Sequence, residues 1–265
     1  MKTGPLAYES ADRRRIRDSG DLLPPLLPPQ AALFHDLDGS LVELAETPDS
    51  IVVAETLPGL LQALQQMLGG ALAIVSGRRL ESIDRLLAPL RLAGAGVHGA
   101  ELRHSPGGAV LRGDAAPMRG IRRELQQSFA SDPRIIVEDK GLSVALHYRQ
   151  APERMAECHA LAADLSLSNG LTMNIGKSVV EILPPGPNKG HATRALLQHP
   201  PFAGRLPVFV GDDETDEDGI ALVQELGGIG IKVGAGPSAA DYRIPDVATV
   251  HRWLAASVEA LGERG

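Results

Sequence analysis

Two short acidic motifs follow apolar segments of the chain and contain residue types suited to metal and phosphate chemistry. In the first, HDLDGS (residues 35–40), Asp36 and Asp38 lie two positions apart, and Gly39 permits a sharp turn after them. One carboxylate of such a pair could act as a nucleophile and the second as a general acid and base. An Asp-Gly pair also ends strands as an ordinary turn, so this motif alone leaves both interpretations open.

The second motif, VGDDETDEDG (210–219), holds six acidic residues directly after the apolar segment LPVFV. So much negative charge next to a buried strand is unfavourable unless a cation neutralises it, although a solvated acidic loop is the alternative. Ligands that are all oxygen favour Mg²⁺ or Ca²⁺ over zinc. An EF-hand is rejected, because a strand rather than a helix precedes the loop.

Two other polar residues could hold a phosphate group. Ser76 in VSGR (75–78) offers a hydroxyl at the end of a predicted strand, and Lys189 in PPGPNKG (184–190) starts a predicted helix. A lysine and a helix N-terminus both favour an anion. Each residue alone fits an ordinary helix cap or surface lysine. Together with both acidic motifs, in this chain order, they indicate phosphoryl chemistry.

The segments around these motifs predict an α/β fold. Apolar runs without two-residue alternation predict strands at 31–36, 71–78, 206–213 and 228–234. Between and after them, apolar residues at helical spacing predict helices at 56–68, 79–90, 189–198, 217–227 and 247–262. This alternation indicates a doubly wound parallel sheet covered on both faces. Ligands of such sheets bind at the carboxyl ends of the strands, where the acidic motifs and Ser76 lie.

The middle of the chain has a different pattern, with adjacent strands separated by short polar turns. Residues 101–112 predict a hairpin, and the segments that follow predict helices and strands in antiparallel pairing. An α+β module inserted into the parallel domain explains this better than two tandem domains. The predicted division is a tail with paired prolines at 1–30, a catalytic core at 31–107 and 183–265, and a cap at 108–182.

Composition excludes several classes of function. The formal net charge of −7 and the aromatic content of 3% argue against binding of nucleic acid. Cys158 is a lone cysteine in a helical segment and is interpreted as a small buried thiol. With no apolar run of membrane-spanning length and no signal peptide, a cytoplasmic protein is expected. The glycines of 94–99 match a dinucleotide-binding pattern, but no adequate helix follows them.

The four motifs resemble those of the haloacid dehalogenase (HAD) superfamily, over about residues 31–262. The resemblance implies that Asp36 attacks phosphorus and forms an aspartyl-phosphate, and that Asp38 protonates the leaving oxygen and later activates water. It also implies that Ser76 and Lys189 hold the phosphoryl group.

The same resemblance implies a Mg²⁺ site. Its ligands would be Asp36, the backbone carbonyl of Asp38 and Asp212, with Asp213 and Asp216 close by or as an extra ligand. In this chemistry Mg²⁺ lets a carboxylate approach a phosphate dianion, because it cancels their repulsion.

A finer resemblance is to trehalose-6-phosphate phosphatases. It is carried by VSGR, by GVHGAELR (96–103), VEDKGLSVALHYR (137–149) and VVEILP (179–184), by the lysine of GPNKG (186–190), and by GDDETDED (211–218). The long central segment lies in the inserted module, which the resemblance identifies as a cap that closes over the sugar. The residues expected to bind substrate are Gly77, Arg78, His98, Glu101, Glu138, Lys140, His147, Arg149 and Glu181.

The expected function is therefore a Mg²⁺-dependent phosphatase that converts trehalose 6-phosphate to trehalose and inorganic phosphate. The alternatives are a HAD phosphatase for sucrose phosphate or glucosylglycerol phosphate, or a phosphohexomutase. A non-catalytic binding protein is disfavoured, because it would not need the second carboxylate of Asp38. The expected partner is a small sugar phosphate, with neither nucleic acid nor membrane. Association with a trehalose-phosphate synthase is conceivable, but no motif supports it.

Overall fold

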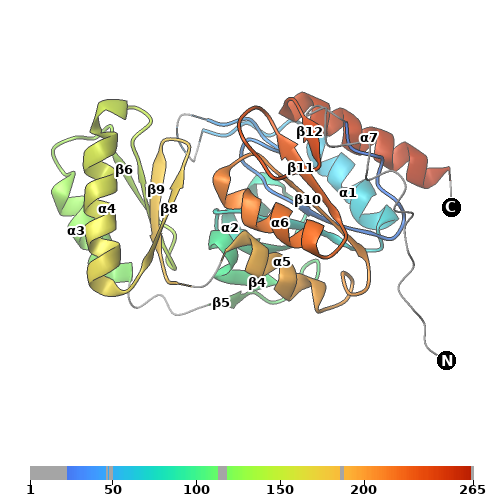
Figure 1. Ribbon diagram of the computed structural model, residues 1–265, viewed down its shortest axis with the longest axis horizontal. Helices are drawn as coiled ribbons and strands as arrows, with labels where there is room; N and C mark the ends of the chain where they lie inside the picture. The colour runs from blue at the N-terminus through green and yellow to red at the C-terminus, as the bar shows by residue number, and fades with distance from the viewer. Residues whose placement is uncertain (1–22, 46, 48–49, 113–117, 186–187, 264–265) are drawn as a thin grey trace.

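The structure is a computed structural model that describes residues 23–45, 47, 50–112, 118–185 and 188–263. The prediction of a tail therefore lies outside the described residues for 1–22. The described chain forms two bodies, a larger core and a smaller cap, each with its own sheet and its own cluster of buried apolar side chains (Figure 1).

The core is built on one eight-stranded sheet. Its strands are β1 (Ala31–His35), β2 (Leu72–Val75), β3 (Ala93–Gly96), β4 (Glu101–Arg103), β5 (Leu111–Arg112), β10 (Leu206–Gly211), β11 (Ile229–Val233) and β12 (Tyr242–Ile244). Their spatial order is β12-β11-β10-β1-β2-β3-β4-β5. Neighbours from β12 to β3 pair in parallel, and β4 and β5 are added antiparallel. The doubly wound core predicted from the sequence is confirmed.

Helices cover both faces of this sheet. They are α1 (Leu57–Met67), α2 (Leu80–Leu86), α5 (Lys189–Leu197), α6 (Glu217–Glu225) and α7 (Val247–Gly262), with the short 3₁₀ turns η1 (Val97–Gly99) and η3 (Glu214–Asp216). Across the sheet, the connection from β1 to β2 runs toward β5, and the connection from β10 to β11 runs toward β12, in the opposite direction. Because such crossovers are right-handed, α1 and α6 lie on opposite faces. In Figure 1, α1 packs with α7 on one side and α5 with α6 on the other.

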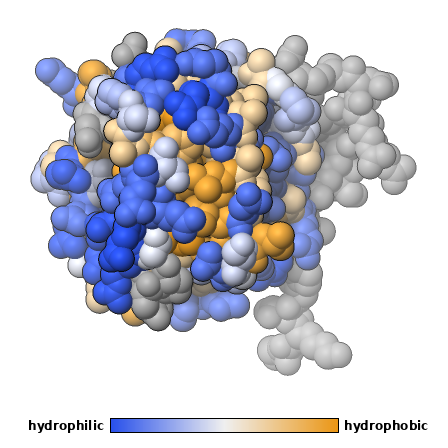
Figure 2. Space-filling model, turned by 90° about the vertical axis from the view of Figure 1, so that its left-hand side faces the viewer, coloured by the Kyte–Doolittle hydropathy of each residue, from blue (hydrophilic) through white to orange (hydrophobic). Residues whose placement is uncertain are grey.

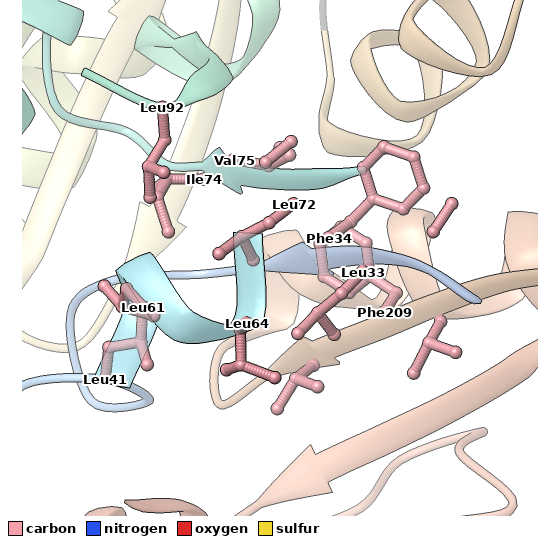
Figure 3. Packing of buried hydrophobic residues seen from close by; sticks show 14 of the residues in the cluster. Leu33, Phe34, Leu41, Leu61, Leu64, Leu72, Ile74, Val75, Leu92 and Phe209 are labelled. Atoms are coloured by element: carbon pink, nitrogen blue, oxygen red, sulfur yellow. The ribbon is translucent and has the colours of Figure 1, made fainter. Parts of the chain in front are cut away.

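The parallel strands are buried on both faces, which explains why they read as continuous apolar runs. All five residues of β1 are buried, and Phe34 pairs in register with Phe209 of β10. The ring of Phe34 also lies 5.2 Å from that of Phe202. Figure 3 shows part of this cluster, in which Leu61 and Leu64 of α1 lie near the strands. Burying each such side chain contributes roughly 1.5–3 kcal/mol, so the core fixes the strand ends firmly.

The strand order reverses at β1. This strand lies between β10 and β2, and the connections from β1 and β10 leave toward opposite edges of the sheet. A reversal of this kind leaves a crevice at the carboxyl ends of the strands, where ligands bind in open α/β sheets. The motifs 35–40, 75–78 and 210–219 lie at the ends of these three strands. The topology therefore brings the three motifs together.

The cap has an antiparallel sheet with helices on one face. Its elements are β6 (Ile136–Asp139), β7 (Val144–His147), β8 (Thr172–Gly176), β9 (Val179–Leu183), α3 (Met118–Ser128), α4 (Met155–Asn169) and the 3₁₀ turn η2 (Pro152–Arg154). The strand order is β6-β7-β9-β8. Val144 and Leu146 of β7 pack in the apolar cluster, whereas His147 of the same strand lines a pocket. Side chains alternate across the sheet, so the polar set faces the core.

The cap helices form the end of the molecule farthest from the core. Figure 2 looks onto this end and shows hydrophobic residues near its centre, with hydrophilic residues around them. On α4, Leu167 is exposed, whereas Cys158 is completely buried, as predicted for a structural thiol. Among the helices that the structure describes, none is long and apolar enough to cross a membrane.

Three features differ from the sequence interpretation. First, Leu111–Arg112 pairs with β4 in the core sheet, although the predicted division placed it in the cap; we propose a cap that spans 118–183. Second, Leu27 of the predicted tail is buried, and its N–H donates to Ser257 of α7. Third, β3 and β12 were not predicted; the Ala-Gly sequence of β3 carries no β-branched or aromatic signal.

Candidate active site

Asp36 and Lys189 form the buried centre of the crevice. Asp36 directly follows β1, and Lys189 is the first residue of α5, whose N-cap Asn188 accepts a hydrogen bond from the backbone N–H of His191. Lys189 Nζ lies 2.8 Å from Asp36 Oδ1 and 2.6 Å from Asp216 Oδ1. Burial alone would lower the pKa of Lys189, but the two carboxylates raise it well above its usual value. The lysine is therefore a permanent cation beside Asp36.

Asp216 organises the acidic loop that follows β10. Its Oδ2 accepts hydrogen bonds from the backbone N–H groups of Asp212 and Asp213, at 3.0 and 2.9 Å. Lys232 of β11 donates to the carbonyl oxygen of Asp212 at 2.7 Å. These contacts fix the backbone of Asp212, so its carboxylate projects into the crevice from a rigid support.

The carboxylates at this position fit a hard cation. Ligand oxygens of Asp36, Asp212 and Asp216 lie within 4.8 Å of one another, and all three residues are buried. Asp212 Oδ1 is buried without a hydrogen-bond partner among the described residues. Burial and the neighbouring carboxylates raise the pKa of Asp36, although Lys189 opposes them; burial also raises the pKa of Asp212, despite its contact with Lys177. Oxygen donors with excess negative charge match a hard divalent cation.

Two residues assigned to the metal site have side chains outside this carboxylate cluster. Asp38 was expected to bind the metal through its backbone carbonyl, and Asp213 to lie close by or to act as an extra ligand. Asp213 instead caps η3, where its Oδ1 accepts a hydrogen bond from the backbone N–H of Glu214 at 2.6 Å. Asp216, which the sequence left as a neighbour or an extra ligand, belongs to the cluster, although its oxygens already accept bonds from Lys189 and the loop backbone.

Asp38 lies at the mouth of the crevice in contact with Arg78. The guanidinium binds both carboxylate oxygens, with Nε to Oδ2 at 2.7 Å and Nη2 to Oδ1 at 3.0 Å. Asp212 leaves no room for a side chain at position 39. A Cβ on Gly39 would lie 2.2 Å from Asp212 Oδ2, and its φ of 79° is in the left-handed region. Glycine is therefore required here.

Ser76 completes the core side of the site. It is buried at the end of β2, and its Oγ accepts a hydrogen bond from the backbone N–H of Arg78 at 3.2 Å. The hydroxyl proton is left to donate to a bound anion. The structure thus brings Ser76 into the same crevice as Asp36 and Lys189, as the sequence predicted.

On the cap side, Glu181 is the centre of a buried polar network. It accepts hydrogen bonds from Lys140 Nζ at 2.8 Å, from the hydroxyl of Ser143, and from the ring of His98 at 3.1 Å. Burial would raise the pKa of Glu181, but Lys140 and His98 hold it well below its usual range. Likewise, burial would lower the pKa of Lys140, but Glu181 and Glu138 raise it.

A second pair lies on the same face of the cap sheet. His147 Nε2 lies 2.8 Å from Glu138 Oε2. Burial would raise the pKa of Glu138, but the bond to His147 and the nearby Lys140 lower it. Arg149 follows β7 and donates to the carbonyl oxygen of Ala45 in the core, which ties the cap to the loop after β1.

One pocket joins the two polar groups, and nearly all of the predicted site residues line it. Those lining it are Asp36, Asp38, Ser76, Gly77, Arg78, His98, Glu138, Lys140, His147, Arg149, Glu181, Lys189, Asp212 and Asp213. Asp216 lies beneath, bonded to Lys189. The structure does not bring Glu101 to the pocket. Its carboxylate accepts the backbone N–H of Leu80 at 2.7 Å and thereby holds the N-terminus of α2.

The sequence interpretation missed several residues of the pocket. Lys177, in the turn between β8 and β9, contacts Asp212 Oδ2, and Asn174 and Thr215 line the pocket as well. A lysine in a strand turn carries no recognisable signal. Lys232, which supports the site by donating to the carbonyl oxygen of Asp212, did carry a sequence signal. A lysine inside the apolar segment GIGIKVG is costly to bury without a partner.

Solved structures identify the class of fold. The C-terminal domain of Candida albicans trehalose-6-phosphate phosphatase matches with a TM-score of 0.75 at 18% identity, covering 87% of this chain and 93% of that one. A haloacid dehalogenase-like hydrolase from B. subtilis matches with a TM-score of 0.60 at 14% identity, covering 84% and 99%. The fold is that of the HAD-like phosphatases with a cap.

Sequence comparisons then give the family. The family model described as trehalose-phosphatase matches residues 34–248, so the chain belongs to this family. A trehalose-6-phosphate phosphatase from Escherichia coli K12 is 41% identical over 242 residues, 91% of each chain. A probable trehalose-phosphate phosphatase from Sinorhizobium fredii is 44% identical over 205 residues, 77% of each. The resemblance and the predicted enzyme class, a phosphoric monoester hydrolase, are confirmed.

Proposed function

We propose that this protein hydrolyses trehalose 6-phosphate to trehalose and inorganic phosphate in the pocket between core and cap. The observation that carries the proposal is the joining of two unlike groups in one pocket. Asp36, Ser76 and Lys189 of the core face Lys140 and Glu181 of the cap. The first group suits a phosphate and the second suits sugar hydroxyls. Relatives that are named for this activity cover most of the chain.

In the first step of the proposed reaction, a carboxylate oxygen of Asp36 attacks phosphorus. The bond between phosphorus and the sugar oxygen breaks, and Asp38 gives its proton to that oxygen, so trehalose leaves. Lys189 and the hydroxyl of Ser76 hold the phosphoryl oxygens during the transfer. Positioning and charge stabilisation supply most of the catalysis in reactions of this type.

In the second step, water attacks the phosphorus of the aspartyl-phosphate. Asp38 takes the proton of this water, and inorganic phosphate leaves with Asp36 restored. Asp38 thus alternates between acid and base, and the bidentate contact with Arg78 holds its carboxylate at the mouth of the crevice meanwhile.

Mg²⁺ would be held by Asp36, Asp212 and the backbone carbonyl of Asp38, with Asp216 behind them. The bound ion would offset the repulsion between the carboxylates and the phosphate. The unpartnered Asp212 Oδ1 and the elevated pKa values of Asp36 and Asp212 support this assignment.

The sugar would be recognised by the polar face of the cap sheet. Glu138, Lys140, His147, Arg149 and Glu181 present charged donors and acceptors toward the pocket. A site built to hydrogen-bond hydroxyls rejects analogues that lack them, because its buried groups are then left without partners. Substrate choice is therefore assigned to the cap and chemistry to the core.

A panel of sugar phosphates tests the proposal. Purified protein with Mg²⁺ is assayed for phosphate release from trehalose 6-phosphate, sucrose phosphate, glucosylglycerol phosphate and glucose 1-phosphate. We expect the highest kcat/KM for trehalose 6-phosphate. A higher value for either of the other disaccharide-like substrates, or conversion of glucose 1-phosphate to glucose 6-phosphate, would replace the proposed substrate or reaction. The cytoplasmic location and the absence of nucleic-acid and membrane partners stay predictions, and the association with a trehalose-phosphate synthase stays untested.

A further inference from the structure

His98 lies on a strained turn between β3 and β4. Val97 and His98 have φ angles of 49° and 53°, in the left-handed region that a β-branched residue rarely adopts. Two backbone hydrogen bonds hold this turn against the loop after β2. Val97 N–H donates to the carbonyl oxygen of Arg78 at 2.9 Å, and His98 N–H to that of Ser76 at 3.1 Å. Strain that is retained at a site is a reason to look for a role there.

The strained backbone points the imidazole of His98 into the pocket. The residue is 7% exposed, and a Cβ on Gly77 would lie 2.7 Å from His98 Nε2, so the ring is stacked against the loop. Nε2 lies 3.1 Å from Glu181 Oε2, and because that carboxylate is ionised, Nε2 is the donor. Nδ1 has no hydrogen-bond partner among the described residues. The bond to Glu181 is thus the polar contact that the ring makes.

This bond joins the two bodies of the protein. Glu181 belongs to β9 of the cap, and its other partners, Lys140 and Ser143, are also in the cap. His98 belongs to the core, on the turn that carries backbone bonds to Ser76 and Arg78. A movement of Glu181 would therefore act on the loop that holds the catalytic groups.

The loop after β2 also contacts Asp38, which follows β1. Arg78, whose carbonyl accepts the bond from Val97, binds both carboxylate oxygens of Asp38. A continuous series of contacts therefore runs from the sugar-facing carboxylate of the cap to the acid of the core. Spatial continuity alone does not establish energetic coupling, so the series needs a test that measures coupling.

We propose that His98 is a positioning residue that links Glu181 of the cap to the loop at Ser76 and Arg78, so that a sugar held by Glu181 orients Asp38 for proton transfer. The proposal rests on the proposed function. It assigns part of the sugar's binding energy to the chemical step rather than to affinity, which is how remote parts of a substrate raise kcat. A substrate without a sugar cannot use the link.

Two substitutions distinguish the contribution of the His98 hydrogen bond from that of the bulk of its ring. His98→Gln keeps a donor near the place of Nε2, and His98→Leu keeps similar bulk without a donor. Each is assayed with trehalose 6-phosphate and with p-nitrophenyl phosphate, which has no sugar. For trehalose 6-phosphate we expect His98→Leu to lower kcat about 10- to 100-fold, the range for a hydrogen bond to a charged group. The loss for p-nitrophenyl phosphate should be at least tenfold smaller, and His98→Gln should recover most of the kcat.

A double-mutant cycle with Glu181→Gln tests the link itself. If His98 acts through Glu181, adding His98→Leu to Glu181→Gln should change kcat for trehalose 6-phosphate by no more than about twofold, because independent sites add and linked sites do not. Additive losses would overturn the proposal. So would a rise in KM with kcat unchanged, which would make His98 a simple binding contact.

The outcomes also separate this proposal from the proposed function. Wild-type protein that hydrolyses p-nitrophenyl phosphate but not trehalose 6-phosphate would refute the proposed function. Wild-type protein that hydrolyses both, with equal losses in His98→Leu, would refute the link alone. Thermal unfolding checks that each variant is folded. If His98→Leu fails to fold, His98→Asn takes its place, because Asn tolerates positive φ and is too short to reach Glu181.

Discussion

The core and the cap each present a group of carboxylates to the pocket, and the two groups have opposite electrostatic states. In the core, burial and crowding raise the pKa values of Asp36 and Asp212, although lysines lie against both. In the cap, contacts with lysine and histidine lower the pKa values of Glu138 and Glu181, although Glu181 is buried and Glu138 half-buried. The core carboxylates carry more negative charge than the neighbouring lysines neutralise, whereas the charge of the cap carboxylates is neutralised by lysine and histidine.

This difference assigns different tasks to the two groups. An uncompensated cluster is completed by a cation, and its charge is then available to act on a phosphate. A compensated cluster needs no further charge and can exchange hydrogen bonds with neutral hydroxyls. The predictions below test this division, beginning with the change that should affect the core most.

Replacing Asp36 should have the largest effect. Asp36→Asn removes the proposed nucleophile while keeping its shape, so phosphate release should fall by about 10⁴-fold or more, as when a nucleophile is deleted. The loss should be the same for trehalose 6-phosphate and p-nitrophenyl phosphate, because both substrates use the core. Thermal unfolding should show no loss of stability, since the crowding of carboxylates is relieved. A variant that retains substantial activity on either substrate would remove Asp36 from this role.

Removal of metal should come next. EDTA should lower turnover by more than about 100-fold, since a metal supplies several kcal/mol of charge stabilisation, and Mg²⁺ should restore it. Binding is measured separately by thermal unfolding. Mg²⁺ should raise the Tm of the wild-type protein, and the shift should be smaller in Asp212→Asn. Full turnover in EDTA, or equal shifts in both proteins, would contradict the reading of the core as an incomplete cation site.

A substitution in the cap should have a smaller and selective effect. Glu138→Gln removes the charge that pairs with His147 and Lys140, so kcat/KM for trehalose 6-phosphate should fall about 10- to 100-fold. The fall for p-nitrophenyl phosphate should be much smaller. Asp139→Asn is the matched control, because Asp139 adjoins Glu138 in the chain but its carboxylate pairs with Arg122 outside the pocket. Equal losses on both substrates, or an equal loss in the control, would show that this part of the cap does not determine substrate specificity.

The sequence predicted the site residues of the core better than those of the cap. Asp36 with Asp38, and the acidic run from Asp212 to Asp216, are contiguous motifs at strand ends. Their residue types and spacing were therefore sufficient to predict them as site residues. The α/β alternation of the core was predictable for a similar reason, because its buried strands are continuous apolar runs.

The cap contacts could not be derived in that way. Lys140 and Glu181 meet only through antiparallel register, with Ala145 of β7 opposite Glu181, and were found by family resemblance. Lys177 gave no signal because its role depends on where a turn of the cap lies over the core. Glu101 was grouped with the substrate contacts because its motif adjoins His98, yet its side chain turns to the N-terminus of α2.

The smallest effect should come from a buried histidine of the core outside the pocket. Burial lowers the pKa of His35 to about 3, and its Nε2 has no hydrogen-bond partner among the residues described. The unfolded chain takes up a proton near pH 6.5, whereas the folded protein does not until about pH 3. Stability should therefore fall as the pH drops below 6.5, by up to about 1.4 kcal/mol per pH unit from this group.

Urea unfolding at pH 7.5, 6.5 and 5.5 measures this contribution. His35→Phe should lose less stability than wild type between pH 6.5 and 5.5, because the phenyl ring cannot bind a proton. Parallel pH dependences in the two proteins would show that His35 does not titrate on unfolding.

We propose above all that the cap recognises the whole disaccharide while the core acts on its phosphate. The ratio of kcat/KM for trehalose 6-phosphate to that for glucose 6-phosphate tests it directly in the wild-type protein, since the two substrates share the phosphorylated glucose. We expect a ratio of about 10 or more, because the second glucose contributes binding energy to the reaction. A ratio near 1 would contradict it.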